Sequence, residues 1–306
     1  MTAPSSVSTF LQSAETLAER LLKASLAPAD RYTGHSLADR NAKVIRELLP
    51  FYSWFYHYYF RVKTDGWEHI PPTGKVLLVG AHNGGLAAPD TVMMAYDWMK
   101  RFGPDRPAYA LMDLKIWQAF PGLARLATQV GAIQANASMA VTALRHGAAV
   151  LLYPGGVQDV FRPYSLRRQI YFQGNTSFIK LALMESAPIV PLISRGAHST
   201  LVILADVYEQ LQGIQPGGFP WPFDFDPGTF PIYIGLPWGL AIGPWPNIPM
   251  PVTLHTRVCP PVVFERYGAA AAHDQDYVDA CYQQVCDLMQ TQLDSLFAER
   301  ACFFNG

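Results

Sequence analysis

One stretch of the sequence combines the residue types that proton transfer requires. Residues 76–90 read Val-Leu-Leu-Val-Gly-Ala-His-Asn-Gly-Gly-Leu-Ala-Ala-Pro-Asp. An apolar run, typical of a buried strand, leads into His82, and the glycines Gly84 and Gly85 let the backbone turn or approach a ligand closely. A neutral imidazole can take the proton of a hydroxyl group, and a carboxylate on the other ring nitrogen fixes its tautomer. The pattern predicts that His82 is a general base and that Asp90, at the start of a helical pattern, orients it.

Each residue of this pair also has a structural explanation. His82 could be a core histidine whose ring is satisfied by the backbone. Asp90 could be a helix N-cap, because Pro-Asp-Thr before an apolar helix suits that position. For each residue taken singly, the structural explanation is preferred to a catalytic role. Together, at the end of a strand and beside two glycines, the two residues favour catalysis.

A second apolar run, residues 150–153, leads into another pair of glycines, Gly155 and Gly156. Parallel strands bring their carboxyl ends to one edge of a sheet, where open α/β folds place ligands. We therefore expect both glycines to lie near His82, where their N–H groups could face a developing oxyanion or the head group of a substrate. An ordinary turn is the alternative, because Pro-Gly-Gly is by itself a weak signal.

Taken in order, these blocks resemble the glycerolipid acyltransferase superfamily, also described as PlsC-like or lysophospholipid acyltransferases. His82-Asn-Gly-Gly followed by Asp90 is similar to the His-to-Asp signature of the superfamily, and closer to a bacterial branch with His-Ser-Gly-Gly and a delayed Asp. Residues 154–159, Pro-Gly-Gly-Val-Gln-Asp, resemble a block of the type-2 diacylglycerol acyltransferases and phytyl ester synthases. Residues 178–191 resemble the helix and strand that follow in these families. The resemblance covers roughly residues 67–261.

The resemblance implies an O-acyltransferase that moves a fatty acyl group from acyl-coenzyme A or acyl carrier protein to a lipid hydroxyl, with no cofactor and no metal. It implies His82 as the catalytic base and Asp90 as the orienting carboxylate. Seven residues separate them, whereas four is the commonest spacing, so the resemblance fixes the histidine better than its acidic partner. The other members of the two motifs are expected to bind substrate: Asn83, Gly84, Gly85, Pro154, Gly155, Gly156, Asp159 and Arg162.

The second block also bears on the acceptor. Members of the superfamily with phosphorylated acceptors carry Glu-Gly-x-Arg there, and this Arg can pair with a phosphate. Here Gly155 replaces the Glu, and Gln158 stands where the Arg would be. The resemblance therefore implies a neutral acceptor, such as diacylglycerol or a long-chain or prenyl alcohol, over lysophosphatidate or another lysophospholipid. Arg162, Arg167 and Arg168 could still supply charge, or could form a solvated basic face.

The elements that must position these residues alternate along the chain. Apolar runs predict strands at residues 75–81, 108–113, 148–153, 189–194 and 253–259. Helical periodicity predicts helices at residues 90–102, 116–130, 139–146, 177–186 and 275–299. Such alternation predicts an α/β fold with a mixed, largely parallel sheet flanked by helices. We expect an acyltransferase domain over residues 65–306, after an N-terminal helical, membrane-associating region over residues 1–64.

Two further segments are unusually apolar. Leucines at helical spacing predict an amphipathic helix over residues 8–26, and a second helix over residues 37–61 is aromatic nearly all round at residues 51–60. The aromatic helix could be sandwiched between the first helix and the domain, or its Trp and Tyr could anchor it at a membrane interface. Residues 212–250 are rich in Gly, Pro, Trp and Phe. For them we expect a lipid-facing lid or acyl-channel wall, or else an irregular loop packed by its own aromatics.

The composition favours a protein of the membrane surface. Half of the residues are hydrophobic and only 15% are charged, against about a quarter in ordinary soluble domains. A net charge of -1 provides no basic field for nucleic acid. No stretch reaches the roughly 20 apolar residues of a spanning helix, no secretory signal begins the chain, and the cysteines form no CxxC pair. We therefore expect a cytoplasmic, peripheral protein whose partners are a lipid acceptor, an acyl thioester, the membrane surface and, as one option, acyl carrier protein.

Two other functions fit parts of the sequence. A lipid hydrolase would need a nucleophile, usually a serine in Gly-x-Ser-x-Gly, and the sequence has no such motif. A non-catalytic lipid-binding or transfer module would need only the apolar segments, and His82 would then be structural.

Overall fold

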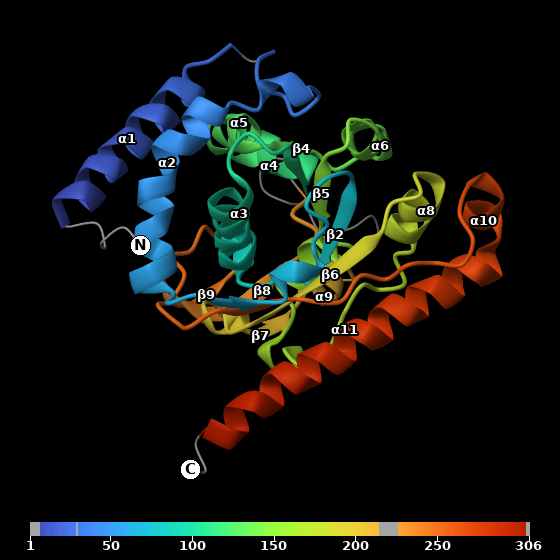
Figure 1. Ribbon diagram of the computed structural model, residues 1–306. Coiled ribbons are helices and arrows are strands. Elements are labelled where there is room, and N and C mark those ends of the chain that lie inside the picture. The colour runs from blue at the N-terminus through green and yellow to red at the C-terminus, as the bar shows by residue number, and fades with distance from the viewer. Residues whose placement is uncertain (1–6, 29, 214–225, 304–306) are drawn as a thin grey trace.

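A seven-stranded sheet forms the centre of the molecule (Figure 1). The computed structural model describes residues 7–28, 30–213 and 226–303. The strands lie in the order β1-β10-β6-β2-β5-β3-β4, and every neighbouring pair is parallel except β10 and β6. The predicted mixed, largely parallel sheet is thus confirmed. Its strands are β1 (Lys63–Asp65), β2 (Val76–Gly80), β3 (Ala108–Met112), β4 (Ala132–Gln134), β5 (Ala149–Leu152), β6 (Ile189–Arg195) and β10 (His255–Val258).

Helices flank the sheet, and several begin or end where the sequence provides a cap. The side chain of Asn41 accepts hydrogen bonds at the start of α2, Asn136 does so at the start of α6, and α5 ends at Gly131 with φ +115°. The helices on the N-terminal side are α1 (Val7–Ser25), α2 (Ala42–Trp54), α3 (Pro89–Phe102), α4 (Leu114–Ala119), α5 (Pro121–Val130) and α6 (Ala137–Arg145). Those that follow are α7 (Gly156–Val160), α8 (Ser177–Met184), α9 (Tyr208–Gln212), α10 (Ala269–His273) and α11 (Gln275–Phe303).

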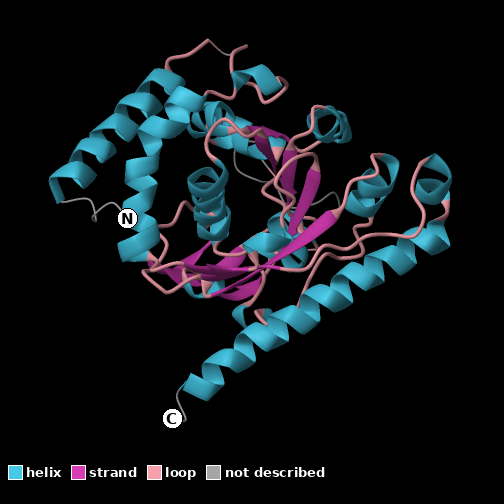
Figure 2. Cartoon of the chain, in the orientation of Figure 1, coloured by secondary structure: helices cyan, strands magenta, loops and turns pink. Residues whose placement is uncertain are grey.

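The hydrophobic core lies on both faces of strand β2, between two layers of helices (Figure 2). All five residues of β2 are buried, and successive side chains of a strand point to opposite faces. Leu77 and Val79 belong to the cluster that includes residues of α6, α8 and α11. Val76 and Leu78 belong to the cluster that includes residues of α3. The strand that leads into His82 is therefore fixed from both sides.

A second, smaller sheet contains β7 (Val202–Asp206), β8 (Pro231–Gly235) and β9 (Gly239–Ile242), all antiparallel. The irregular structure predicted for residues 212–250 is therefore wrong for β8 and β9, although residues 214–225 lie outside the described part. The helix predicted over residues 116–130 is two helices, because Pro121 starts a new helix at its first position.

The N-terminal aromatic segment packs against the first helix. The predicted helix over residues 37–61 consists of a 3₁₀ turn, α2 and a π-helical turn, Phe55–Tyr59. The ring of Phe10 in α1 lies 4.3 Å from that of Trp54 and 5.7 Å from that of Phe51, measured between centroids. Packing against α1 is confirmed, whereas a membrane-associating role of residues 1–64 stays a prediction. Within the described ranges, no helix combines the length and apolarity that crossing a membrane requires.

Candidate active site

Three neighbouring parallel strands end at the same edge of the central sheet. Strand β2 is followed by His82, β5 by Tyr153 and the Pro-Gly-Gly block, and β6 by a turn that contains His198. Because β2 lies between β5 and β6, the segment after β2 has the other two on either side. The sheet therefore brings together residues that are more than 100 positions apart in the sequence.

His82 and Asp90 form the predicted pair. The Nδ1 atom of His82 lies 3.1 Å from Oδ2 of Asp90. The side chain of Asp90 is only 4% exposed, whereas that of His82 is 16% exposed. The carboxylate also accepts hydrogen bonds from the backbone N–H of Asn83 at 2.9 Å and of Thr91 at 2.7 Å. With Nδ1 donating to Asp90, the lone pair of the ring lies on Nε2, the nitrogen that a general base needs.

A tight turn closes the seven-residue gap between the histidine and the aspartate. Gly84 and Gly85 have φ values of +95° and +70°, and a 3₁₀ turn, Gly85–Ala87, follows. A Cβ on Gly84 would lie 2.7 Å from Cδ of Pro89, so that no larger residue fits without displacing the start of α3. Pro89 occupies the first turn of α3 and Asp90 comes next. The seven-residue spacing is therefore compatible with the contact between His82 and Asp90, because the turn brings the start of α3 back to the histidine.

Tyr153 supports the imidazole from the side. Its ring is stacked on that of His82, with centroids 4.2 Å apart and planes inclined by 24°. Burial raises the pKa of the Tyr153 hydroxyl well above its usual value, and the charge of Asp90 acts in the same direction. A Cβ on Gly80 would lie 2.3 Å from the Tyr153 ring, so the glycine that ends β2 makes room for the stacked tyrosine. The sequence alone does not reveal this stacking, because it depends on the pairing of β2 with β5.

The second block holds the backbone of His82. The N–H of His82 donates to Oδ2 of Asp159 at 2.7 Å, and Oδ1 of Asp159 lies 3.1 Å from the Arg162 guanidinium. Asp159 is completely buried and Arg162 is 2% exposed. The predicted proximity of the two blocks is therefore observed. The partners of Asp159 and Arg162 in the described structure are protein groups, and their contact with substrate stays a prediction.

Arg162 connects three segments below the site. It donates to the carbonyl oxygen of Gln169 at 2.6 Å, to Nε2 of His198 at 2.9 Å and, more weakly, to Oδ1 of Asn83 at 3.5 Å. Burial and the neighbouring arginines lower the pKa of His198 to about 3, so its ring is neutral and can accept this hydrogen bond. This contact joins residues that are 36 positions apart, so no local sequence pattern marks His198.

The residues at the start of the second block have structural partners too. A Cβ on Gly155 would lie 2.5 Å from the carbonyl oxygen of Tyr171. The N–H of Gly156 donates to the carbonyl oxygen of Tyr153 at 3.2 Å, and the carbonyl oxygen of Pro154 accepts from the side chain of Asn175 at 2.9 Å. The N–H of Gly156 is therefore used within a turn, which was the alternative to an oxyanion site.

The electrostatics favour a strong base at position 82. Burial lowers the pKa of His82, but the charge and hydrogen bond of Asp90 and the charge of Asp159 outweigh burial and raise it above its usual value. Burial also raises the pKa of Asp159 to about 6, against the opposing charge of Arg162 and the hydrogen bond from His82. The charges of Asp90 and Asp159 can therefore stabilise an imidazolium at His82.

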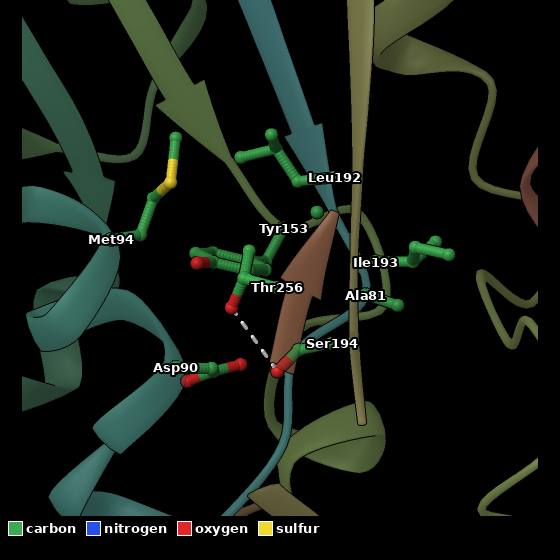
Figure 3. A pocket seen from close by; sticks show the side chains of 9 residues that line it. Ala81, Asp90, Met94, Tyr153, Leu192, Ile193, Ser194 and Thr256 are labelled. Carbon is green, nitrogen blue, oxygen red and sulfur yellow. Dashed lines mark hydrogen bonds between the residues drawn. The ribbon is translucent and has the colours of Figure 1, made fainter. Parts of the chain in front are cut away.

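A small cavity lies behind Asp90 (Figure 3). Its volume is about 10 Å³, close to the space of one water molecule and far below the 300–1,000 Å³ of typical ligand pockets. The side chains of Tyr153, Asp90, Ser194 and Thr256 surround it, and the hydroxyl groups of Ser194 and Thr256 lie 3.5 Å apart. The cavity is too small to hold a fatty acyl chain.

Comparisons with known proteins agree with this geometry. A family model described as Acyltransferase matches residues 61–195. Uncharacterized proteins of Mycobacterium bovis and Mycobacterium tuberculosis are 27% identical over 271 residues, which cover 87% of this chain and 69% of theirs. The crystal structure of the 1-acyl-sn-glycerophosphate acyltransferase PlsC from Thermotoga maritima matches with a TM-score of 0.50 and 12% identity, over 95% of this chain and 94% of that one. This structural likeness shows a shared fold.

Proposed function

We propose that the chain is an O-acyltransferase of the glycerolipid acyltransferase superfamily that acts on a lipid hydroxyl, because a family model described as Acyltransferase matches residues 61–195. The donor is an acyl thioester, either acyl-coenzyme A or acyl carrier protein. The observation that carries the proposal is the 3.1 Å contact between His82 and Asp90, at the edge of the sheet where β2 ends. A histidine with its Nδ1 held by a carboxylate is arranged for proton transfer at Nε2.

The proposed reaction has two steps at one carbonyl carbon. Nε2 of His82 takes the proton of the acceptor hydroxyl while its oxygen attacks the thioester carbonyl, and a tetrahedral intermediate forms. The C–S bond then breaks, and the departing thiolate takes the proton from the His82 imidazolium. Asp90 stabilises the imidazolium between the steps, and the Asp159 carboxylate adds to this through its charge. Atoms and charges balance without a cofactor or a metal.

We favour a neutral acceptor, such as diacylglycerol or a long-chain or prenyl alcohol. Arg162 is engaged by Asp159, Gln169 and His198, and the guanidinium groups of Arg167 and Arg168 stack on Tyr164 and Phe297. Gln158 stands where phosphate-acceptor members carry an arginine. A lysophosphatidate acceptor is the alternative, because the Thermotoga maritima enzyme of similar fold is named for a phosphorylated acceptor.

The proposal is tested with purified protein, labelled palmitoyl-coenzyme A or palmitoyl acyl carrier protein, and a panel of neutral and phosphorylated acceptors. We expect product with a neutral acceptor and a loss of about 10²–10⁴-fold or more in kcat/KM for His82→Ala. His146→Ala is the matched control, because His146 is exposed and bonds only to its own helix. Lipid binding without any transfer in the unaltered protein would support the non-catalytic alternative, and lysophosphatidate as the best acceptor would overturn the neutral one.

A further inference from the structure

The small sheet has an apolar outer face. Cross-strand pairs Ile232–Ile242 and Ile234–Leu240 point to the same side, and Leu240 and Ile242 are 69% and 54% exposed. The opposite side packs through Tyr233 and Ile203 against Val160 and Phe161 of the second block. Antiparallel sheets at a protein surface normally alternate apolar inward and polar outward side chains. This sheet is apolar on both sides.

The apolar character extends beyond the strands. We use "apolar face" for the exposed large side chains of the sheet and its loops: Leu204, Ile234, Leu236, Trp238, Leu240, Ile242, Trp245 and Ile248. The exposed indole rings satisfy their own N–H groups, since Trp238 donates to the carbonyl oxygen of Pro246 at 2.8 Å and Trp245 to that of Ile242 at 2.7 Å. These rings can therefore enter an apolar medium without leaving a donor unpaired.

The segment that forms most of this face carries no charge. Residues 227–254 contain no Asp, Glu, Lys, Arg or His, although 15% of the chain is charged. Protein–protein interfaces have an apolar centre inside a polar rim, and electrostatic attraction to anionic lipids needs Lys or Arg. A continuous face without charge fits insertion among lipid chains and head groups of a neutral bilayer.

Residues adjacent to the apolar face contact the turn that follows β2. Leu201, which precedes β7, lies 2.5 Å from where a Cβ on Gly85 would be, and Asn247 lies 3.0 Å from the same point. Tyr59, in the N-terminal aromatic segment, donates to the carbonyl oxygen of Pro249 at 2.8 Å.

From these observations we propose that the apolar face inserts into the surface layer of a lipid bilayer and holds the turn after β2 against the membrane. The inference rests on the proposed function in one respect, since a lipid acceptor would then reach His82 without leaving the bilayer. It goes beyond that function because it assigns the docking surface to the small sheet, in addition to any contribution of the N-terminal helices.

Vesicles of phosphatidylcholine alone, with and without brominated acyl chains, test the proposal. We expect Leu240→Ser/Ile242→Ser to weaken vesicle binding by about tenfold for each side chain withdrawn from the bilayer, while Leu123→Ser, an exposed leucine on α5, leaves binding unchanged. We also expect bromine to quench tryptophan emission in the unaltered protein and in Trp54→Phe, and much less in Trp238→Phe/Trp245→Phe. Binding should persist at high salt, because charge does not drive it.

Three results would overturn the proposal. Quenching that is lost in Trp54→Phe but kept in Trp238→Phe/Trp245→Phe would assign docking to the N-terminal segment. A dimer in analytical ultracentrifugation that Leu240→Ser/Ile242→Ser dissociates, without vesicle binding, would make a second copy the occupant. Shielding of Trp238 and Trp245 from acrylamide before any vesicle is added would mean that the chain covers the face itself. Failure of acyl transfer with intact vesicle binding would instead contradict the proposed function alone. A soluble short-chain alcohol acceptor separates the proposed function from the proposed docking surface, because its acylation does not require membrane binding.

Discussion

At the scale of single residues, the contact between Asp90 and His82 predicts how activity depends on pH. The base must be neutral, so activity falls as the pH drops through the pKa of His82, which Asp90 and Asp159 raise above its usual value. In Asp90→Asn the largest raising influence disappears while burial still lowers the pKa. We expect the acid limb of the kcat/KM profile to move to lower pH. We also expect the pH-independent value of kcat/KM to fall by about 10²–10⁴-fold, because the tautomer of the His82 ring is no longer fixed.

A pH profile of kcat/KM for both proteins measures this. His146→Gln is a suitable comparison, because His146 is exposed and bonds to Thr142 of its own helix. If Asp90→Asn left the acid limb where it was, a group other than His82 would be the base.

The buried pair Asp159 and Arg162 predicts a second pH effect, on stability. Burial raises the pKa of Asp159 to about 6, above the value of about 3.9 in an unfolded chain. A raised carboxyl pKa stabilises the fold most at low pH, and this contribution is lost as the pH rises through the folded pKa. Arg162→Met removes the cation that lowers this pKa, so we expect a loss of about 3–5 kcal/mol at pH 8 and a smaller loss at pH 5.

Urea unfolding at the two pH values tests this expectation. In Asp159→Asn/Arg162→Met the difference between the two pH values should largely vanish, since neither charge remains. An equal loss for Arg162→Met at both pH values would show that packing, and not the unpaired carboxylate, determines the effect.

The sequence identified His82, Asp90 and the glycines because their types and order carry the signal. It could not identify Tyr153 or His198 as part of the site, because each acts through a contact that only the sheet creates. Tyr153 stacks on His82 across the β2–β5 pairing, and His198 meets Arg162 across 36 residues of sequence. No local pattern distinguishes such residues from ordinary core residues.

At the scale of elements, two adjacent glycines in the second block should respond differently to alanine. Gly155 has an ordinary φ of −73°, but its Cβ would collide with the backbone at Tyr171 and with Asp159. Gly156 has φ +56° and open space around it. We expect Gly155→Ala to displace α7 and with it the hydrogen bond from His82 to Asp159, which would lower kcat by roughly 10²-fold.

Gly156→Ala is the matched control. It should cost about 1 kcal/mol of stability through its left-handed backbone and leave kcat within a few-fold. Steady-state kinetics and thermal unfolding of both variants separate the two causes. Comparable kcat in the two variants would mean that the position of Asp159 does not control catalysis.

Elements with strong local signals were predictable from the sequence. Strand β2 and helix α3 are long apolar or periodic runs, and the structure places both within one or two residues of the predicted ends. The short strands β1 and β4 have three residues each, too few for any periodicity to appear. The sequence does not predict β8 and β9, because prolines and glycines surround them and both of their faces are apolar, so that apolar and polar residues do not alternate.

At the scale of the whole molecule, the helix that covers much of the core, α11, and the segment that carries the candidate catalytic pair lie in different places. Helix α11 packs alongside β6 (Figure 1), and Arg195 at the end of β6 donates to the carbonyl oxygen of Leu296 in that helix at 2.8 Å. The candidate catalytic pair, His82 and Asp90, lies away from this helix, at the segment between β2 and α3. The helix buries one stripe of side chains in the core: Val278, Cys281, Val285, Met289, Leu293 and Leu296.

This separation predicts that a cavity under α11 lowers stability without changing the chemistry. Met289 is completely buried in the core shared with β2 and α8, so Met289→Ala should reduce the free energy of unfolding by about 2–5 kcal/mol. Gln284→Ala, on the exposed side of the same helix, should stay within about 0.5 kcal/mol. Well below the unfolding temperature, Met289→Ala should keep kcat within a few-fold and the acid limb of its pH profile unchanged, because no contact of His82 or Asp90 is altered. An acid limb that moved with this substitution would show that the core beneath α11 sets the position of the base, and that the two sides of the sheet are coupled.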